Sequence, residues 1–275
     1  MALTGSDIAC FTATIWDNKY LSEKAVNDIV KRWKGKSDEK PRLYGTAVRK
    51  SGLLYAMFKE DIHVVPYNTE FIEKKWPVIR AIDSHPQIPI HITWLAINPN
   101  GECAIVDELV CPENATIKRC ATLIKAKEYN MNIIYGVIDT SSNTKQHQEN
   151  GRVSKTDKQL FAQESIVCRN AKKEWDYGHH VVQEALQGVE ITNRETGAKE
   201  IYYKFHIYDN CIEVIYQFKH CAWKDPANDD VDGPQRQVKK RDHMIDLVRY
   251  ELVEYPMPIK QTNSPKHFFG GPGRG

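Results

Sequence analysis

The sequence predicts a mixed α/β fold whose first three strands are antiparallel, whose later strands are parallel, and whose helices lie on both faces of the sheet. Apolar runs at 78–82, 91–97 and 103–110 have the length of buried strands. The last two are joined by Asn98-Pro99-Asn100-Gly101, a tight-turn sequence, so they should form a hairpin. Helical patterns then alternate with further strands, which is typical of a mixed sheet covered on both sides.

The remaining elements follow from local signals. A helix should start near 112–114, because apolar residues at 117, 120, 121 and 124 recur at helical spacing. Gly188 ends the next long helical pattern. Further strands are expected at 132–138 and 165–168 and in a hairpin of 189–192 with 200–205, and further helices at 171–187, 210–218 and 242–253.

The two ends of the chain differ from this central pattern. Residues 1–75 have no long apolar run; they contain a helix at 22–33, started by Ser22, and short extended pieces at 53–58 and 62–65. We interpret 1–75 as a linker packed on the main body and 76–258 as the main domain. Residues 259–275 are rich in Pro and Gly and are expected to be a flexible tail.

Composition excludes several classes of protein. The 275 residues are 41% hydrophobic and have a formal net charge of +2, which argues against a polycationic coat but allows local basic strips. The seven cysteines form no C-x-x-C pair, so we expect reduced thiols in a cytosolic protein rather than a zinc ribbon. No signal peptide and no run of 18 apolar residues is present, so no membrane span is expected.

Three aspartates are candidates for chemistry because of where they fall. Asp83 and Asp139 each follow an apolar strand, and Asp246 lies on the predicted helix from 242, on the same side as Asp242 and His243. If the strands are neighbours, these carboxylates converge, and like charges so close require a cation. Hard oxygen ligands select Mg²⁺ or Mn²⁺, and two such ions promote phosphodiester hydrolysis.

The simpler interpretation is structural. An aspartate after a strand is commonly a turn former or a helix cap. Asp107 and Glu108 would add a further acid to such a site, or else form a salt bridge at a strand end. From these residues alone the chain is a mixed α/β domain with a candidate metal site.

Two groups of basic residues are candidates for binding DNA phosphates. Lys145 and Arg152 lie in the polar segment 140–158, which we expect to be a loop; an ordinary solvated loop is the alternative. Lys239, Lys240 and Arg241 lie just before the helix with Asp246, where a bound phosphate would have to approach the acids.

Three segments together resemble the nuclease domain of the large terminase subunits of tailed bacteriophages. The third is the most specific, with Asp-His, then Asp246, then Arg-Tyr on one helix. Residues 16–21 and 42–45 also look like the end of that family's ATPase region. The three segments are Ala81-Ile82-Asp83-Ser84-His85-Pro86, Gly136-Val137-Ile138-Asp139 and Val238-Lys239-Lys240-Arg241-Asp242-His243-Met244-Ile245-Asp246-Leu247-Val248-Arg249-Tyr250.

The resemblance implies an RNase H-like fold and an endonuclease, dependent on two Mg²⁺ or Mn²⁺ ions, that cuts concatemeric double-stranded DNA in the cytoplasm of a bacterial host. Its acidic triad corresponds to Asp83, Asp139 and Asp246, with His243 and Asp242 near the second metal. The implied partners are double-stranded DNA, a portal protein, a small terminase subunit and an ATPase domain. Residues 1–75 would be the remnant of the ATPase region.

One departure from the family bears on function. The sequence contains no G-x-x-x-x-G-K-[ST] motif, so the packaging ATPase is not part of this chain, which we expect to be an excised domain or a split or truncated gene product. Two alternatives to the nuclease hypothesis stay open. One is a catalytically silent domain that docks a packaging motor or binds DNA, and the other is a different RNase H-like nuclease, such as a junction resolvase.

Overall fold

The computed structural model describes most of the chain, and its residues fall into two compact units. One unit comprises 1–51 with 224–236, and the other comprises 52–223 with 237–275. The predicted division at residues 76 and 259 stays a prediction. The described residues are 13–34, 39–45, 52–85, 89–140, 155–192, 197–224, 237–238 and 241–254.

The described residues of the smaller unit are mainly helical. It contains η1 (Ile15–Asp17), α1 (Glu23–Trp33) and α2 (Glu39–Tyr44). The predicted helix at 22–33 is confirmed, and the Ser22 hydroxyl accepts a hydrogen bond from the Ala25 amide at 3.3 Å. The helix α2 was not predicted, because six residues are too few to show helical periodicity.

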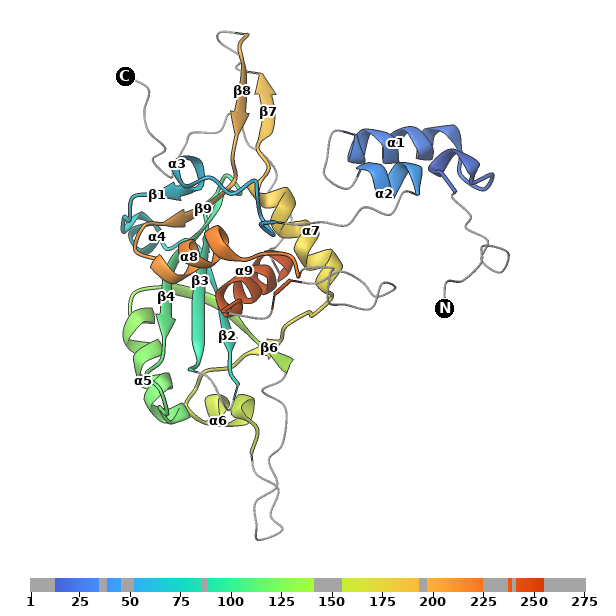
Figure 1. The fold of residues 1–275 in the computed structure, drawn as a ribbon. Helices are drawn as coiled ribbons and strands as arrows, with labels where there is room; N and C mark the ends of the chain where they lie inside the picture. Colours follow the sequence, from blue (N-terminus) through green and yellow to red (C-terminus); the bar gives the residue numbers. More distant parts are fainter. Residues whose placement is uncertain are drawn as a thin grey trace, which may run out of the picture. The chain divides into compact units, whose positions relative to one another are not determined.

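The larger unit is built on one mixed sheet (Figure 1). Its strand order is β1-β9-β4-β3-β2-β5-β6 among the described residues. The run β2-β3-β4 is antiparallel, whereas β5 is parallel to β2, β6 to β5, β9 to β4 and β1 to β9. The predicted arrangement is therefore confirmed. The strands are β1 (Val64–Val65), β2 (Pro77–Asp83), β3 (His91–Ile97), β4 (Cys103–Val110), β5 (Asn132–Ile138), β6 (Arg169–Asn170) and β9 (Phe205–Tyr208).

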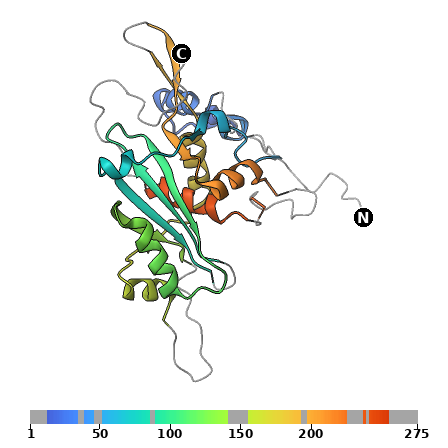
Figure 2. The same ribbon diagram turned by 90° about the vertical axis from the view of Figure 1, so that its left-hand side faces the viewer.

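Helices cover both faces of this sheet (Figure 2). Side chains alternate along β2, so Arg80 and Asp83 point to opposite faces. Arg80 Nη1 lies 2.8 Å from Glu128 Oε1 at the end of α5, whereas Asp83 contacts His243 at the start of α9. The helices are α3 (Glu60–His63), α4 (Glu70–Glu73), α5 (Ile117–Glu128), α6 (Asp157–Gln163), α7 (Trp175–Leu186), α8 (Ile212–His220) and α9 (His243–Glu254).

The helix α9 closes the main core. It packs across β2 and β3 and buries Met244, Ile245, Leu247 and Val248, which are all fully shielded from solvent. An apolar face of this kind fixes both the position and the rotation of the helix. None of the helices that the structure describes is long and apolar enough to cross a membrane.

A two-stranded hairpin extends away from the sheet (Figure 1). It consists of β7 (Val189–Thr192) and β8 (Lys199–Tyr202), paired antiparallel. A hairpin was predicted here, but its second strand ends at Tyr202. Residues 205–208 form β9, which joins the main sheet.

Several predicted boundaries were wrong for local reasons. The helix expected from 112–114 begins at Ile117, because Asn114 has a φ of +57° and Thr116 caps the first turn. The strand expected at 165–168 does not form there, because Ser165 has a φ of +62°, which is not an extended conformation. The strand in this part of the chain is β6, which begins at Arg169. The helix expected from 171 begins at Trp175.

Three further expectations differ from the structure. Of the loop predicted at 140–158, residues 141–154 lie outside the described residues, and α6 begins at Asp157 after a capping box of Thr156 and Gln159. Within the extended piece expected at 53–58, only Leu53 has β-type pairing, as an isolated antiparallel β-bridge with Ala222. The piece expected at 62–65 is the end of α3 followed by β1.

Candidate active site

Asp83 and Asp139 lie side by side at one edge of the sheet. The strands β2 and β5 are parallel neighbours, with Ile82 opposite Ile138, and the Asp139 amide donates a 2.9 Å hydrogen bond to the Ile82 carbonyl. Both aspartates follow fully buried isoleucines, and both are themselves buried. The order of the sheet therefore brings together two acids that are 56 residues apart in the chain.

The start of α9 adds three more polar residues, Asp242, His243 and Asp246. Their position depends on Gln217 of α8, whose Oε1 accepts hydrogen bonds from the amides of Met244 at 2.9 Å and Ile245 at 3.3 Å. This buried side chain acts as a tertiary cap for the helix, since the first amides of a helix have no partner within it. Gln217 was not anticipated from the sequence, because the cap comes from another helix.

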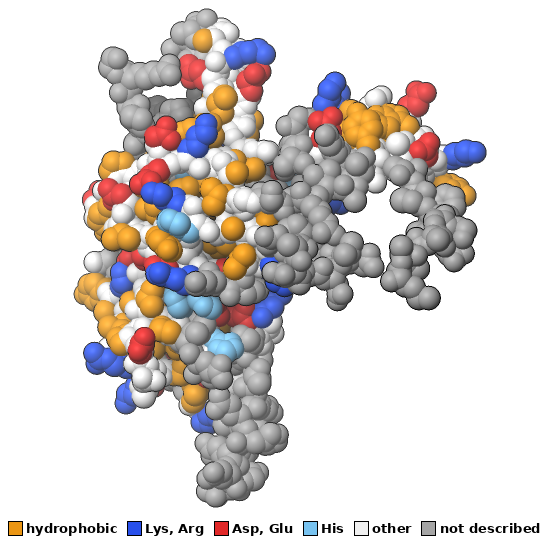
Figure 3. Space-filling view, in the orientation of Figure 1, with side chains coloured by type: hydrophobic (Ala, Val, Ile, Leu, Met, Phe, Trp, Pro, Cys, Tyr) orange, Lys and Arg blue, Asp and Glu red, His pale blue; other side chains and the backbone are white. Residues whose placement is uncertain are grey.

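These acids line one cavity of about 430 Å³. On the face shown in Figure 3, acidic, basic and histidine side chains gather beside α9. The lining residues come from the ends of β2 and β5, the segment leading into α7, and the helix α9. They are Asp83, His85, Asp139, Lys173, Trp175, Arg241, Asp242, His243, Asp246, Arg249 and Tyr250.

Each sheet-edge acid has a hydrogen-bonding or cationic partner from elsewhere in the chain. His243 Nδ1 donates to Asp83 Oδ2 at 2.8 Å. Asp139 accepts a 2.6 Å hydrogen bond from the Tyr250 hydroxyl and lies 2.6 Å from Lys173 Nζ. These contacts fix the carboxylates and offset their mutual repulsion.

The acids of α9 are held in a similar way. Arg249 Nη2 donates to Asp246 Oδ1 at 2.8 Å. The Gln237 amide donates to Asp242 Oδ2 at 2.5 Å and to Asp246 Oδ1 at 3.3 Å. The cavity is therefore a network of acids with matched donors rather than a cluster of bare carboxylates.

Two histidines stack at the rim of this network. The rings of His91 and His243 are 4.7 Å apart between centroids and tilted by 23°. The hydrogen bond to Asp83 raises the pKa of His243 above its ordinary value. Burial, and then the neighbouring charge of His243, lower the pKa of His91. Opposite shifts in one stacked pair mean that His243, next to Asp83, binds a proton more readily than His91 does.

The carboxylate oxygens of the cavity are suitable ligands for a hard divalent cation, although they are not close enough together to form a complete metal site. Four aspartates face one cavity, and carboxylate oxygens are the ligands that Mg²⁺ and Mn²⁺ prefer. Among the described residues, no three His, Cys, Asp or Glu side chains are close enough together to hold a metal ion. Lys173, Arg249 and His243 instead contact three of the carboxylates.

The structure thus brings most of the predicted site residues together. Asp83, Asp139, Asp242, His243 and Asp246 all line the cavity, as does Arg241. Their catalytic and metal-binding roles stay predictions. The predicted DNA-binding residues Lys145, Arg152, Lys239 and Lys240 lie outside the described residues.

Several cavity residues were missed by sequence reasoning. Nothing in the sequence singled out Lys173 or Trp175, which lie at the entry to α7. Arg249 and Tyr250 belong to the Arg-Tyr pair of the resemblance, which assigned them no role. Asp107, considered as a further acid, forms a salt bridge with Lys127 at 2.6 Å and does not line the cavity.

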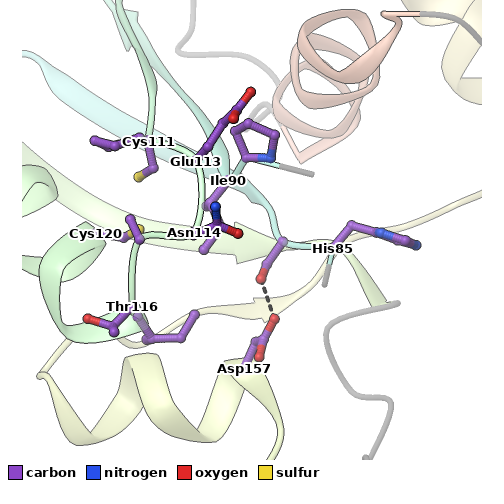
Figure 4. A pocket seen from close by; sticks show the side chains of 13 residues that line it. His85, Ile90, Cys111, Glu113, Asn114, Thr116, Cys120 and Asp157 are labelled. Carbon is purple, nitrogen blue, oxygen red and sulfur yellow. Dashed lines mark hydrogen bonds between the residues drawn. The ribbon is translucent and has the colours of Figure 1, made fainter. Parts of the chain in front are cut away.

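A second cavity, of about 560 Å³, lies beyond the end of β2 (Figure 4). Its wall includes Ser84, whose hydroxyl donates to Asp157 Oδ2 at 2.5 Å. The thiols of Cys111 and Cys120 lie close together in the same part of its wall (Figure 4), and both are free cysteines. His85 lines both cavities. The catalytic candidates Asp83, Asp139, His243 and Asp246 line the first cavity and not the second.

Comparison with known proteins agrees with the fold described above. No protein-family model matches the sequence, and no curated protein matches it. Among solved structures, the chain is similar to the large terminase from a thermophilic bacteriophage, at 20% identity and a TM-score of 0.62 over 88% of this chain and 53% of that one. It is also similar to the nuclease domain of the P22 large terminase, at 16% identity and a TM-score of 0.51 over 74% of this chain and 93% of that one.

The fraction of each neighbour that is covered shows which part of a large terminase this chain resembles. The chain spans about half the length of the thermophilic phage's large terminase, but its match covers nearly the whole P22 nuclease domain. At these identities the likeness concerns the fold, which is the RNase H-like α/β fold of a phage large-terminase nuclease domain.

Proposed function

We propose that this chain is the endonuclease part of a DNA-packaging terminase and that it hydrolyses double-stranded DNA with two divalent metal ions. The main support is that carboxylates from three separate elements, β2, β5 and α9, face one cavity. Asp83, Asp139 and Asp246 belong to a fold shared with a terminase nuclease domain. Fold alone does not assign function, so the proposal depends on this site.

In this proposal Asp83, Asp139 and Asp246 hold the Mg²⁺ or Mn²⁺ ions, and Asp242 and His243 support the second of them. Bound ions would supply a water of lowered pKa and stabilise the charge that develops on the phosphate. The chain's own residues keep the acids in place: Tyr250 and Lys173 orient Asp139, and Arg249 orients Asp246. Metal binding would compete with Lys173 and Arg249 for the same oxygens.

DNA would approach the cavity through its phosphates. Lys173 and Arg241 line the cavity with side chains that are 43% and 61% exposed, so both are accessible to a backbone phosphate. Lys145, Arg152, Lys239 and Lys240 are proposed to extend this contact. Because phosphate contacts do not depend on base identity, cleavage should show little sequence preference.

The packaging role is part of the same proposal. The structural neighbour from the thermophilic bacteriophage is a whole large terminase, of which this chain spans about half. A separate ATPase domain, a portal protein and a small terminase subunit are the partners we propose, in the cytoplasm of a bacterial host.

The direct test is cleavage of supercoiled plasmid by the full chain with MgCl₂ or MnCl₂. We expect D83N, D139N and D246N to slow nicking and linearisation by about a hundredfold or more, since each removes a charged oxygen donor. The matched control is D107N, which removes the same charge from an acid paired with Lys127 outside the cavity. D107N should cut as fast as the parent chain.

Other outcomes favour the alternatives. No cleavage with any divalent metal, together with intact binding to DNA or a portal, would favour a catalytically silent docking domain. Faster cleavage of four-way junctions than of linear duplex would favour a junction resolvase. Unimpaired cleavage by D83N and D139N would contradict the assigned site.

A further inference from the structure

The wall of the acidic cavity contains one large aromatic ring that the proposed hydrolysis does not use. Trp175 is the first residue of α7, and its side chain lines the cavity together with Asp83, Asp139 and Asp246. Lys173, two residues earlier, contacts Asp139. An indole is therefore part of the same wall as the acids, in a cavity otherwise lined mainly by charged side chains.

Contacts with other aromatic residues fix the orientation of the Trp175 ring. The Trp175 ring stacks on the ring of His179, one turn later in α7, with centroids 4.9 Å apart and planes only 8° from parallel. Trp223 meets both rings edge-on, at 5.7 Å from Trp175 and 5.0 Å from His179. Tyr55 packs on His179 at 5.1 Å. A ring held in this way loses little further freedom when a ligand binds to it.

The other tryptophans around the sheet have a different environment. Trp76 and Trp94 are fully buried, and Trp223 is 9% exposed, as expected for core packing. Trp175 is only partly buried: it packs against the core and also lines the polar cavity. Packing encloses the first three rings, whereas Trp175 packs on the core with one part of its ring and lines the cavity beside the carboxylates with another.

We propose that Trp175 is a stacking site for an unpaired nucleobase next to the bond that is cut. This inference rests on the proposed nuclease function and adds a binding site to it. Aromatic rings stack on every base, whatever its identity. Lys173 and Arg241 line the same cavity and offer positive charges to the adjoining phosphates. In an intact duplex both faces of a base are occupied by its neighbours, so the ring engages DNA that is locally unstacked.

A direct prediction is a preference for duplexes that contain a displaced base. A duplex with a single bulged 2-aminopurine, whose fluorescence falls when it stacks, is compared with the same duplex in which 2-aminopurine is paired with thymine. Binding is followed in EDTA, so that no DNA is cut. We expect the full chain to quench the bulged probe and to bind it about tenfold more tightly than the paired probe.

The variants separate stacking from folding. W175A should lose both the quenching and the preference, whereas W175F keeps a ring and should retain most of each. The control is Y177A, which removes a 54% exposed aromatic residue from the same helix and should change neither. Thermal unfolding of each variant shows whether α7 is still in place.

The results also distinguish this inference from the proposed function. Equal quenching by W175A and the parent chain, or no binding of either probe, overturns the stacking site even if the protein cuts plasmid. Trp175-dependent quenching by a chain that never cuts DNA supports the stacking site and removes the nuclease proposal. A paired probe bound as tightly as the bulged one also contradicts the inference.

Discussion

The hydroxyl of Tyr250 donates a 2.6 Å hydrogen bond to Oδ2 of Asp139, joining the middle of α9 to the end of β5 across 111 residues of sequence. Burial, followed by the charges of Asp246 and Asp139, raises the pKa of Tyr250. The phenol is therefore protonated at neutral pH and acts as the donor to Asp139. This bond sets the rotamer of an acid that we propose as a metal ligand.

Removing this hydroxyl should impair cleavage more than it impairs folding. We expect Y250F to lose about 1–2 kcal/mol of stability and about tenfold in cleavage rate, because Asp139 is no longer oriented. The control is Y208F, which removes a 3.0 Å hydrogen bond to Asn68 away from the cavity. Similar melting temperatures with a slower rate for Y250F alone would confirm the positioning role; equal rates would contradict it.

The cap that Gln217 provides for α9 leads to a second prediction. In Q217A the amides of Met244 and Ile245 lose their acceptor in a buried place, at a cost of about 1–3 kcal/mol. The first turn of α9 should then open more often, which hydrogen exchange at residues 244 and 245 measures. Q159A removes a capping side chain from α6 and should leave these two amides unchanged. Unaltered exchange in Q217A would show that the helix holds itself in place.

Much of the sheet could be predicted from the sequence because its signals are local. The bounds of β3, β4 and β5 agree with the apolar runs, and the Asn-Pro-Asn-Gly turn makes the hairpin between the first two explicit. The strand β9 was missed as a separate element. It follows β8 by two residues, and its neighbours in the sheet, β1 and β4, are far away in sequence.

The site residues that follow strands could be predicted from the sequence, whereas the contacts made by helix residues could not. Asp83 and Asp139 follow strands, so their alignment follows once β2 and β5 are parallel neighbours. The contacts of Lys173 and Tyr250 with Asp139 were not predictable, because they depend on how α7 and α9 pack on the sheet and on each other. Such distances are set by packing between helices, which a sequence pattern does not specify.

The packing of α7 on α9 depends on Gly178. A Cβ at this position would lie 2.6 Å from Cγ and 2.8 Å from Cδ of Arg249, the residue that holds Asp246. Alanine normally favours a helix by about 1 kcal/mol over glycine. Here we expect the clash to prevail, so that G178A destabilises the protein by about 1–3 kcal/mol and slows cleavage by displacing Arg249.

The double variant G178A/R249A tests this cause. Removing the Arg249 side chain eliminates the clash, so the losses of stability in the two single variants should add to more than the loss in the double variant. Urea unfolding of the four proteins measures this difference. Strictly additive losses would mean that Gly178 and Arg249 do not interact.

Glu251 of α9 gives a pH-dependent prediction that does not involve the cavity. Its carboxyl is fully shielded from solvent, and burial raises the pKa of Glu251 well above its ordinary value. The folded protein therefore keeps the proton while the unfolded chain loses it above about pH 4.3. Between these two pKa values the folded state binds more protons, so its stability falls as pH rises, by up to about 1.4 kcal/mol per pH unit.

E251Q keeps the shape of the side chain but cannot ionise, so it removes the pH dependence of stability that Glu251 causes. We expect the variant to gain stability over the parent chain as pH rises from about 5 to about 7, and to lose that advantage below about pH 4, where both forms are neutral. Urea unfolding at several pH values measures the difference directly. E113Q changes an exposed glutamate and should follow the parent curve. If E251Q and the parent chain differ by the same amount at every pH, the pKa of Glu251 is the same in the folded and unfolded states, and a counter-charge within the core must then offset the burial of its carboxylate.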